Sequence, residues 1–360
     1  MTTTANARPV RLGIVGCGSV SHSYLKQAAP MARSGQVELV AACDVAPERA
    51  LALQTKFGIQ RVAGHYLDVV QAADVDLVLI LTSMPEHGPI ARAALEAGKH
   101  VLVEKPMAVS LAEAAELVAL AGRSPGYLLP APHVILSPTY QAIWKRLHNG
   151  DIGPVYSARA LYGWSGPQWG KWFYQPGGGP LFDLGVYNIT SLTGLLGPAR
   201  RVMAMTGVAI PQRRVDNELI QVETEDNAHV LIDFGQACLA VVSTGFFYQQ
   251  YRRPALELYG ARGTLQMLGE DWEPHGFEMW QNEKDGWQVF DETAPDWPWT
   301  DGLRHLVESI QRGTPPIITP EHGFHVLEIM LKAQESGRTG RALDIDSRFT
   351  PIEFSGQDQP

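Results

Sequence analysis

Apolar runs alternate with helical segments through the first third of the chain, and this alternation constrains the fold more than any other feature. The expected strands span residues 10–15, 37–43, 77–81 and 100–103, and the expected helices span residues 21–31, 47–57, 89–97 and 111–121. Strands separated by a helix pair in parallel, because each crossover returns the chain to the same edge of the sheet. The pattern therefore predicts a doubly wound α/β domain with right-handed crossovers.

A glycine-rich turn, residues 16–21 (Gly-Cys-Gly-Ser-Val-Ser), joins the first expected strand to the first helix. In a dinucleotide site the first glycine allows the tight turn, and the second lets the backbone approach a pyrophosphate at the helix N-terminus. We therefore expect Gly16, Gly18, Ser19 and Val20 to bind a dinucleotide. The third position of the fingerprint is a serine here, and a glycine turn without a ligand is the alternative reading.

Asp44 ends the second expected strand, 23 residues after the glycine-rich turn. This spacing is typical of the acidic residue that accepts hydrogen bonds from the ribose hydroxyls. A carboxylate here also repels a 2′-phosphate, and neither of the next two residues is basic. The sequence therefore predicts NAD in preference to NADP, although Arg49 lies within one helical turn. Capping of the helix that starts at Pro47 is the alternative role of Asp44.

The sequence pattern changes near residue 127, where alternating strands begin. Strands are expected at residues 155–161, 201–206, 218–223, 228–234, 237–243 and 256–259, and helices at residues 143–147, 303–311 and 322–335. All nine tryptophans lie at or beyond Trp144. We therefore expect a nucleotide-binding domain (residues 1–126) and a second domain with a large open, predominantly antiparallel sheet (residues 127–360).

Two segments of this second half differ in how well they can be assigned. Asp233-Phe234-Gly235-Gln236 has the composition of a hairpin turn between two expected strands. The acidic, tryptophan-rich segment 270–300 follows neither a strand nor a helix pattern.

Glu104-Lys105-Pro106 follows the fourth expected strand. Ligands of such sheets bind at the carboxyl ends of the strands, so Lys105 is placed to hydrogen-bond a substrate hydroxyl. The positive ring of an oxidised nicotinamide would lower the pKa of this amine. A surface lysine paired with Glu104 is the alternative.

A second motif, residues 177–187, consists of three glycines followed by Pro-Leu-Phe-Asp-Leu-Gly-Val-Tyr. Asp183 and Tyr187 are four residues apart, so a helix would place both on one face. A carboxylate and a phenol opposite a lysine can transfer a proton and orient a hydroxyl. A capping aspartate and a core tyrosine are the alternative.

The composition argues against several classes of function. Lys and Arg total 29 against 38 Asp and Glu, and the net charge of −9 disfavours binding to a nucleic-acid backbone. Cys17, Cys43 and Cys238 have no metal-ligand spacing and are too few for a disulfide framework, which suits a reducing compartment. The chain shows no membrane-spanning apolar stretch and no signal-peptide core, so we expect a cytoplasmic protein. His322 and His325 have no suitably spaced third ligand, so no metal is expected.

On these motifs the chain resembles the Gfo/Idh/MocA oxidoreductases, the family of glucose–fructose oxidoreductase and inositol dehydrogenase. The similarity extends over nearly all 360 residues, with motifs at residues 13–18, 41–44, 94–101, 104–106, 177–187 and 260–264. The resemblance implies a Rossmann domain followed by an open-sheet domain that often forms oligomer contacts. It therefore implies a homodimer or homotetramer that assembles through the C-terminal sheet.

The resemblance also implies catalytic roles. Lys105 matches the active-site lysine of the family, and Asp183 matches the carboxylate that orients sugar hydroxyls. Tyr187 stands where many members have a histidine and where members similar to glucose–fructose oxidoreductase have a tyrosine. Because the usual pKa of a phenol is about 10, Tyr187 would need Lys105 and the oxidised nicotinamide to stabilise its phenolate.

Further cofactor contacts follow from the same resemblance. Thr82 and His87 match a Thr-Pro-x-x-x-His segment of the family except for the proline, which is Ser83 here. We therefore assign Thr82 and His87, together with Glu104 and Lys105, to the cofactor site. A structural role is the alternative for His87.

Trp164, Trp169 and Trp172 precede the glycines of the second motif. Flat aromatic rings suit the apolar C–H faces of sugars, and such rings commonly line ligand sites. We therefore expect these tryptophans and Lys171 to bind substrate together with the aspartate and tyrosine of the motif. Core packing is the alternative for each tryptophan, and solvation is the alternative for Lys171.

Together these features predict an NAD-dependent oxidoreductase that transfers a hydride between nicotinamide and a secondary alcohol of a sugar, polyol or glycoside. Tyr187 or Lys105 would accept the hydroxyl proton, and Asp183 would orient the substrate. Two alternatives are a glycosidase that uses bound NAD for transient oxidation and elimination, and a non-enzymatic nucleotide-sensing regulator. The three candidate catalytic residues argue against the regulator, because a sensor needs no proton relay.

Overall fold

The computed structural model of the protein describes residues 8–354, which form two compact units. The first unit comprises the chain up to His133 together with Thr300–Phe324. The second comprises Val134–Trp299 and the chain from His325 onward. Each unit is built around its own large β-sheet.

The first unit contains a six-stranded sheet in which every pairing is parallel. The strand order is β3-β2-β1-β4-β5-β6. The strands are β1 (Val10–Val15), β2 (Val37–Cys43), β3 (Arg61–Val62), β4 (Leu77–Ile80), β5 (His100–Val103) and β6 (Leu128–Pro130). The expected doubly wound parallel sheet is confirmed, and its order reverses between β1 and β4, where such sheets bind ligands.

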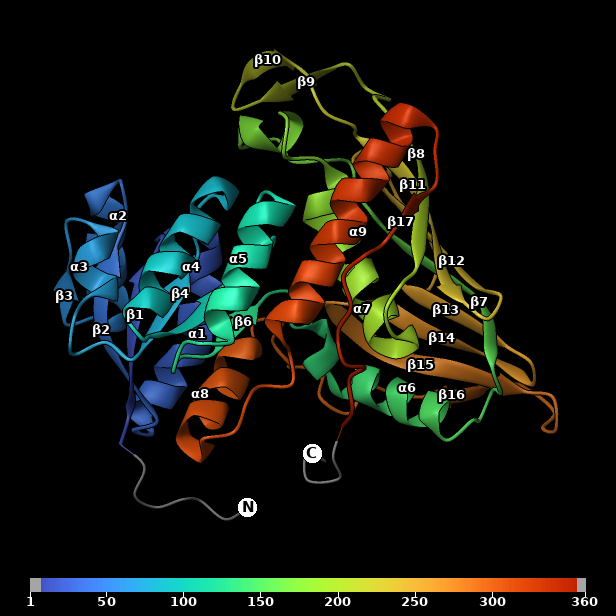
Figure 1. Ribbon diagram of the computed structural model, residues 1–360, viewed down its shortest axis with the longest axis horizontal. Helices are drawn as coiled ribbons and strands as arrows, with labels where there is room; N and C mark the ends of the chain where they lie inside the picture. Colours follow the sequence, from blue (N-terminus) through green and yellow to red (C-terminus); the bar gives the residue numbers. More distant parts are fainter. Residues whose placement is uncertain (1–7, 355–360) are drawn as a thin grey trace. The chain divides into compact units, whose positions relative to one another are not determined.

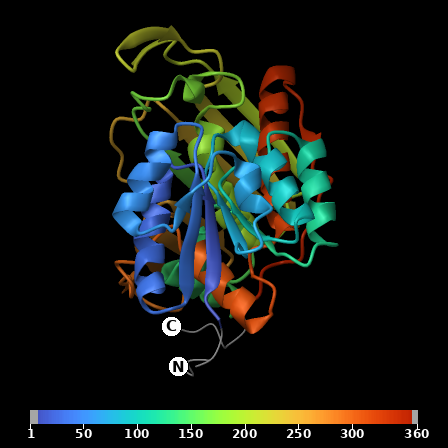
Figure 2. The same cartoon turned by 90° about the vertical axis from the view of Figure 1, so that its left-hand side faces the viewer.

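Helices cover both faces of this sheet (Figure 2). They are α1 (Ser19–Arg33), α2 (Pro47–Phe57), α3 (Tyr66–Val70), α4 (His87–Glu96), α5 (Leu111–Ala121) and α8 (Gly302–Arg312), with a 3₁₀ turn at Met84–Glu86. Helix α1 packs against α2 and α8, whereas α4 packs against α3 and α5. The strands between these two layers form the core, and all four residues of β4 are buried.

Local sequence sets the ends of these helices. Pro47 occupies the first turn of α2, and Gly58 ends this helix in the left-handed conformation with a φ of 74°. Ser110 caps α5 by accepting a hydrogen bond from the backbone N–H of Glu113. These end signals explain why the expected bounds of α2 and α5 are confirmed to the residue.

The division of the chain differs from the expected boundary at residue 126. The first unit continues to His133 and also includes Thr300–Phe324, a segment that we expected in the second domain. The physical reason is packing, because α8 contacts α1, β1 and β5. Leu303, Leu306 and Val307 form its buried face. Hydrophobic periodicity shows that such a face exists, but not which sheet it covers.

The second unit contains a nine-stranded sheet with the order β16-β15-β14-β13-β7-β12-β11-β8-β17. The β7–β12 pairing is parallel and the other pairings are antiparallel. The strands are β7 (Val155–Gly163), β8 (Arg201–Gly207), β11 (Asn227–Gly235), β12 (Cys238–Gly245), β13 (Leu256–Gly260), β14 (Gly263–Glu270), β15 (Glu273–Gln281), β16 (Gln288–Phe290) and β17 (Leu343–Asp344). The expected large, predominantly antiparallel sheet is confirmed.

A separate hairpin and three helices accompany this sheet. The hairpin consists of β9 (Gln212–Val215) and β10 (Glu218–Gln221); the helices are α6 (Pro138–His148), α7 (Val186–Leu196) and α9 (Pro320–Thr339). Helix α6 packs against β14 and β15, and α7 packs against β7 and β12. The hydroxyl of Ser336 in α9 accepts a hydrogen bond from the backbone N–H of Ala204 in β8. In Figure 1 the three helices lie along one face of the sheet.

Three details of the second unit differ from expectation. Residues 218–223 contribute a strand to the separate hairpin and not to the large sheet. The β11–β12 turn consists of Gln236 and Ala237, both with positive φ, because two-residue turns of this kind match the twist of the paired strands. The segment 270–300, which followed no pattern in the sequence, contains β15. The pairing of β15 with β14 is irregular near Gly269, and this irregularity hides the alternation of buried and exposed residues.

Side chains of the large sheet alternate between a buried and an exposed face. The exposed apolar residues of β8, β11 and β12 are Met203, Met205, Leu231, Leu239 and Val241. The register places Leu231 beside Met203 on one side and Val241 on the other. The face opposite the helices therefore carries a continuous apolar stripe.

No described helix is both long and apolar enough to cross a membrane. Among the described residues, no cluster of three or more His, Cys, Asp or Glu side chains is arranged to hold a metal ion. Cys17, Cys43 and Cys238 are buried free thiols. Burial raises the pKa of the Cys17 thiol to about 12, so this thiol stays protonated at neutral pH.

Candidate functional site

The glycine-rich turn after β1 packs directly against the end of β4. Gly16 has a φ of +93°, and a Cβ atom built on it would lie 2.5 Å from the backbone carbonyl carbon of Leu81. The N–H of Gly16 donates to the carbonyl oxygen of Cys43 at the end of β2. Glycine alone fits this position, and the turn thereby joins the ends of three strands.

Gly18, by contrast, faces open space. A Cβ atom built there meets no heavy atom within 4 Å, and its φ of −75° is ordinary for any residue. Gly18 is the N-cap residue of α1 and has no side chain, so no side chain caps the first N–H groups of this helix. This is the arrangement expected of Gly18, Ser19 and Val20 in a dinucleotide site, and their contact with a cofactor stays a prediction.

Asp44 stands beside this turn at the carboxyl end of β2. Its Oδ2 accepts a hydrogen bond from the backbone N–H of Cys17 at 2.6 Å, and its Oδ1 accepts one from that of Ala46 at 2.8 Å. The carboxylate thus fastens the glycine-rich turn to the loop before α2, but it does not cap this helix, whose N-cap residue is Ala46. Each oxygen can accept a second hydrogen bond, so a ribose contact is compatible with this arrangement.

His87 bridges the loops that follow β4 and β5. Its Nε2 lies 3.1 Å from the carbonyl oxygen of Thr82, and its Nδ1 lies 2.7 Å from that of Pro106. Burial lowers the pKa of this imidazole, so the ring is neutral at neutral pH and donates to one carbonyl at a time. Both nitrogens face backbone oxygens, which favours the structural role of His87 over direct cofactor contact. Thr82 is half-buried, and its contact with the cofactor stays a prediction.

Glu104 anchors the end of β5. Its Oε1 accepts a hydrogen bond from the hydroxyl of Tyr24 at 2.8 Å, and its Oε2 accepts one from the backbone N–H of Lys105 at 3.1 Å. Glu104 is buried, so it does not form the surface pair considered as the alternative. Lys105 precedes a cis peptide bond to Pro106. The candidate residues of β1, β2, β4 and β5 therefore share one edge of the sheet.

The glycines of the second motif form a tight loop in the second unit. Gly177 and Gly179 have φ values of +90° and +94°. A Cβ atom on Gly178 would collide with the carbonyl oxygen of Trp172. The loop leads into a single π-helical turn (Leu181–Gly185) that continues as α7.

Asp183 lies in this π-helical turn, and Tyr187 lies in the first turn of α7. From Leu181 to Thr190 these two residues alone are partly exposed, and the other eight are buried. The two side chains therefore open on the same face, as their spacing predicts. Partial exposure of Tyr187 argues against the core-tyrosine alternative. π-Helical turns of this kind are frequent at functional sites.

Tyr162, near the end of β7, was not identified from the sequence and links Tyr187 to a third segment. Its ring lies edge-on to that of Tyr187, with centroids 6.0 Å apart, and is stacked with Trp272 at 6.4 Å. Burial raises the pKa of Tyr162, and the nearby Tyr187, Asp183 and Glu270 raise it further. The turn between β14 and β15 therefore belongs to the candidate site.

This β14–β15 turn is fastened to α7. Asp271 is fully buried, and its Oδ2 accepts hydrogen bonds from the amide of Asn188 and the hydroxyl of Ser191, both at 3.0 Å. Burial raises the pKa of Asp271 to about 6 and that of Glu270 to about 7. In the sequence, the signal for this part of the site is the acidic pair Glu270-Asp271 next to Trp272. Without an assignment of β14 and β15, nothing in the sequence connects this pair to the second motif.

The tryptophans before the second motif differ in their surroundings. Trp164 packs on the core cluster around Phe246, with ring centroids 6.5 Å apart, which is the packing alternative. Trp169 and Trp172 are 55% and 43% exposed. These two rings therefore keep open surface for a ligand, whereas Trp164 supports the loop.

Two ion pairs hold the segment that carries these tryptophans. Lys171 pairs with Glu218 of β10 at 2.5 Å on the surface, so a substrate contact of Lys171 competes with this pair. Arg213 pairs with the buried Asp226 at 2.9 Å and also donates to the carbonyl oxygen of Ser165. Arg213 therefore ties the loop after β7 to the separate hairpin through its hydrogen bond to Ser165.

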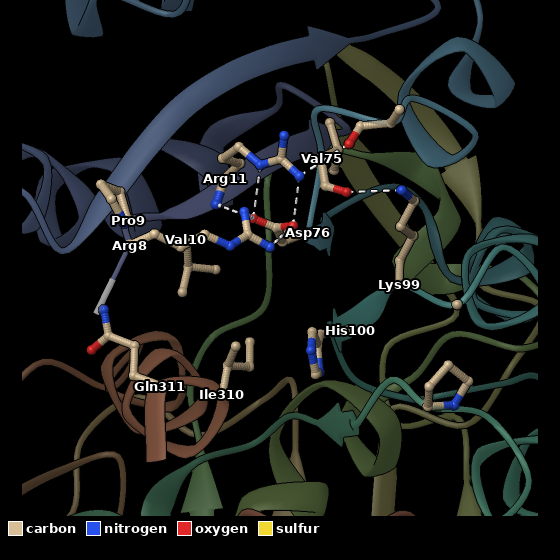
Figure 3. Close-up of a pocket in the computed structure, with 13 residues that line it drawn as sticks. Arg8, Pro9, Val10, Arg11, Val75, Asp76, Lys99, His100, Ile310 and Gln311 are labelled. Carbon is tan, nitrogen blue, oxygen red and sulfur yellow. Dashed lines mark hydrogen bonds and ion pairs between the residues drawn. The ribbon is translucent and has the colours of Figure 1, made fainter. Parts of the chain in front are cut away.

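A cavity of about 520 Å³ lies at the opposite, amino-terminal ends of β1 and β5 (Figure 3). Arg8 and Arg11 line it and both pair with Asp76. The amine of Lys99 donates to two backbone carbonyl oxygens. These cations are engaged within the protein, and the cavity is not the candidate site around Lys105.

Comparison with known proteins agrees with this arrangement. Residues 10–129 match the family model described as an oxidoreductase family with an NAD-binding Rossmann fold. Residues 140–266 match the GFO/IDH/MocA C-terminal domain.

Individual relatives extend the comparison. D-apiose dehydrogenase of Paraburkholderia graminis is 24% identical over 96% of this chain and 92% of its own length. Trans-1,2-dihydrobenzene-1,2-diol dehydrogenase of Mus musculus is 35% identical over 52% of this chain and 56% of its own length. The structure of levoglucosan dehydrogenase in complex with NADH and levoglucosan has the same fold, with a TM-score of 0.84 at 20% identity, and the match covers 94% of this chain and 100% of that chain.

Alanine at the two glycines should separate folding from cofactor binding. We expect Gly16→Ala to destabilise the protein by about 1–3 kcal/mol, because the new Cβ meets the Leu81 backbone at a positive φ. Gly18→Ala meets no atom and should leave the melting temperature unchanged, yet weaken NADH binding by about tenfold or more by filling the approach to the helix N-terminus. Thermal unfolding and a fluorescence titration with NADH measure the two effects. Unchanged NADH affinity in Gly18→Ala would contradict the assigned pyrophosphate contact.

Proposed function

Since the chain belongs to the GFO/IDH/MocA family of oxidoreductases, we propose that it is an NAD-dependent dehydrogenase of a secondary alcohol in a sugar, polyol or glycoside. The observation that carries this proposal is the open face shared by Asp183 and Tyr187. The sugar and diol dehydrogenases among its relatives support the same class of substrate.

The residues of the first unit fit a dinucleotide. Gly18 leaves room for a pyrophosphate beside the start of α1, and Asp44, beside the same turn, would accept hydrogen bonds from the ribose hydroxyls. Thr82 and Lys105 follow β4 and β5 at the same edge of the sheet. Bound nicotinamide would supply the hydride acceptor or donor.

The side chains of this protein would manage the proton and the orientation of the substrate. In the oxidation direction, Tyr187 or Lys105 accepts the hydroxyl proton. The usual pKa of a phenol is about 10, so as the proton acceptor Tyr187 would need a nearby positive charge to favour its phenolate. Asp183 accepts a hydrogen bond from a second hydroxyl and so fixes the orientation of the reacting carbon.

A screen of sugars, polyols and glycosides with NAD tests the proposal. Net formation of NADH with any of these alcohols supports a dehydrogenase. Cleavage of a glycoside without net NADH would identify the glycosidase instead. NADH binding without turnover of any compound would favour the regulator and overturn the proposal.

Substitutions at the two candidate proton acceptors should reduce turnover while leaving cofactor binding in place. We expect Tyr187→Phe and Lys105→Ala to lower kcat by about 10²–10⁴-fold, the range for loss of a general acid–base group. Tyr156→Phe, on an exposed tyrosine of β7, is the matched control and should keep full activity. Steady-state kinetics and an NADH titration provide the measurements. Wild-type kcat in either variant would remove that residue from the mechanism.

We propose NAD as the cofactor in preference to NADP, and Asp44 tests this choice. The protein should bind NADH about tenfold more tightly than NADPH or better, because the carboxylate repels a 2′-phosphate. Asp44→Asn should narrow this ratio by removing the charge. Glu38→Gln, an exposed carboxylate near the other end of β2, serves as the control. Equal or tighter binding of NADPH to the wild-type protein would disprove the preference.

The apolar stripe of the second unit supports assembly into a homodimer or homotetramer. Leu231→Asp would place a charge in the middle of this stripe and should shift the protein toward monomer. Leu219→Asp, on an exposed leucine of the separate β10 hairpin, should not. Analytical ultracentrifugation distinguishes these outcomes, and an unchanged oligomer in Leu231→Asp would place the interface elsewhere. A cytoplasmic location stays a prediction from the sequence.

A further inference from the structure

Three buried polar atoms at the β14–β15 turn have no hydrogen-bond partner among the described residues. They are Oε2 of Glu270, Oδ1 of Asp271 and Nε1 of Trp272. The two carboxylate oxygens accept hydrogen bonds, and the indole nitrogen donates one. Buried polar groups are normally paired, so unpaired acceptors and an unpaired donor within one turn leave partners for a ligand or a water to supply.

The turn holds Glu270 and Trp272 close to the candidate catalytic tyrosine. Asp271, which lies between them in the chain, is bound to Asn188 of α7, and Asn188 directly follows Tyr187. The ring of Trp272 is stacked with Tyr162, whose ring meets that of Tyr187 edge-on. Glu270 and Trp272 are therefore fixed beside the face on which Asp183 and Tyr187 open.

The carboxylate of Glu270 is also held in place. Its Oε1 accepts a hydrogen bond from the hydroxyl of Tyr251 at 2.8 Å. That hydroxyl accepts one in turn from the backbone N–H of Gly163 at the end of β7. With one oxygen anchored, the other is preorganised for a donor from a ligand. Burial raises the pKa of Glu270 to about 7, so an approaching hydroxyl that donates to Oε2 would stabilise the charged form.

We propose that Glu270 and Trp272 form a subsite for an uncharged vicinal diol, in which one hydroxyl donates to Oε2 of Glu270 and the neighbouring hydroxyl oxygen accepts from Nε1 of Trp272. The inference rests on the proposed function, because it extends the same candidate site. Asp183 and Asp271 also lie near the ring of Tyr162. A carboxylate or phosphate on the substrate would meet these like charges, so the site selects neutral sugars and polyols.

Direct binding to the NADH-loaded protein tests the subsite without requiring turnover. The probes are D-glucitol, methyl β-D-glucopyranoside and methyl β-D-glucopyranosiduronate, titrated by calorimetry. The wild-type protein should bind at least one neutral probe about tenfold more tightly than the uronate, or better. Glu270→Gln should reduce this preference by about tenfold, because it removes the charge that holds the diol and repels the uronate. Trp272→Phe should weaken binding of the neutral probe, because the aromatic ring can still stack but lacks the N–H donor.

Glu273→Gln is the matched control. Glu273 begins β15 at the end of the same turn, but its side chain is exposed. The preference of this variant for the neutral probe over the uronate should stay within about twofold of the wild-type value, since an exposed charge contributes little to binding. Thermal unfolding shows which variants fold. If Glu270→Gln does not fold, Trp272→Phe carries the test, and unchanged binding of the neutral probe to that variant overturns the inference.

The outcomes separate this inference from the proposed function. Turnover of sugars with no change of preference in Glu270→Gln overturns the inference and leaves the proposed function standing. Selective binding of a neutral probe that depends on Glu270, without turnover of any compound, supports the inference and overturns the proposed function. Absence of both binding and turnover overturns both.

Discussion

The backbone contact between Gly16 and Leu81 determines how the strand ends of the first unit meet. No side chain fits between them, so the glycine-rich turn and the loop after β4 approach to within van der Waals distance. Asp44 and His87 add two further ties, each directed at backbone groups of neighbouring loops. Side chains thus fasten the loops at this edge of the sheet.

The second unit positions its candidate residues by a related device. Asp271 binds α7 through Asn188, and Arg213, which pairs with the buried Asp226, donates to the loop after β7 at Ser165. In both cases a buried carboxylate takes part in holding together elements that are distant in the chain. Such ties make a site rigid, because breaking one leaves a buried charge without its partner. The loop after β7 and the β14–β15 turn, which border the face that carries Tyr187, are therefore held in place.

Much of the first unit was predictable because its determinants are local. A parallel strand is buried on both faces and reads as an apolar run, as in β4. Gly16 is dictated by a steric constraint on a single residue, and Lys105 is located by its place after a strand. The prediction that Asp183 and Tyr187 share one face was possible for the same reason, since it depends on a four-residue spacing.

The rest of the site depends on register and packing, which one sequence does not display. Tyr162 and Trp272 lie 110 positions apart in the chain and meet because β7, β13 and β14 pair in a particular order. The irregular pairing near Gly269 conceals β14 and β15 from a period-two pattern. For His87, the match to a family motif says nothing about the two carbonyl oxygens that its ring faces.

The return of α8 to the first unit has a consequence for synthesis of the chain. Domains usually fold in the order in which they leave the ribosome. Here the first sheet emerges early, but Leu303, Leu306 and Val307, whose helix packs on β1 and β5, emerge only after β16. The nascent protein must therefore protect an apolar surface of its first unit while nearly the whole second sheet is made. A fragment cut at residue 133 would keep that surface exposed permanently, so the dinucleotide-binding half is not a separable N-terminal piece.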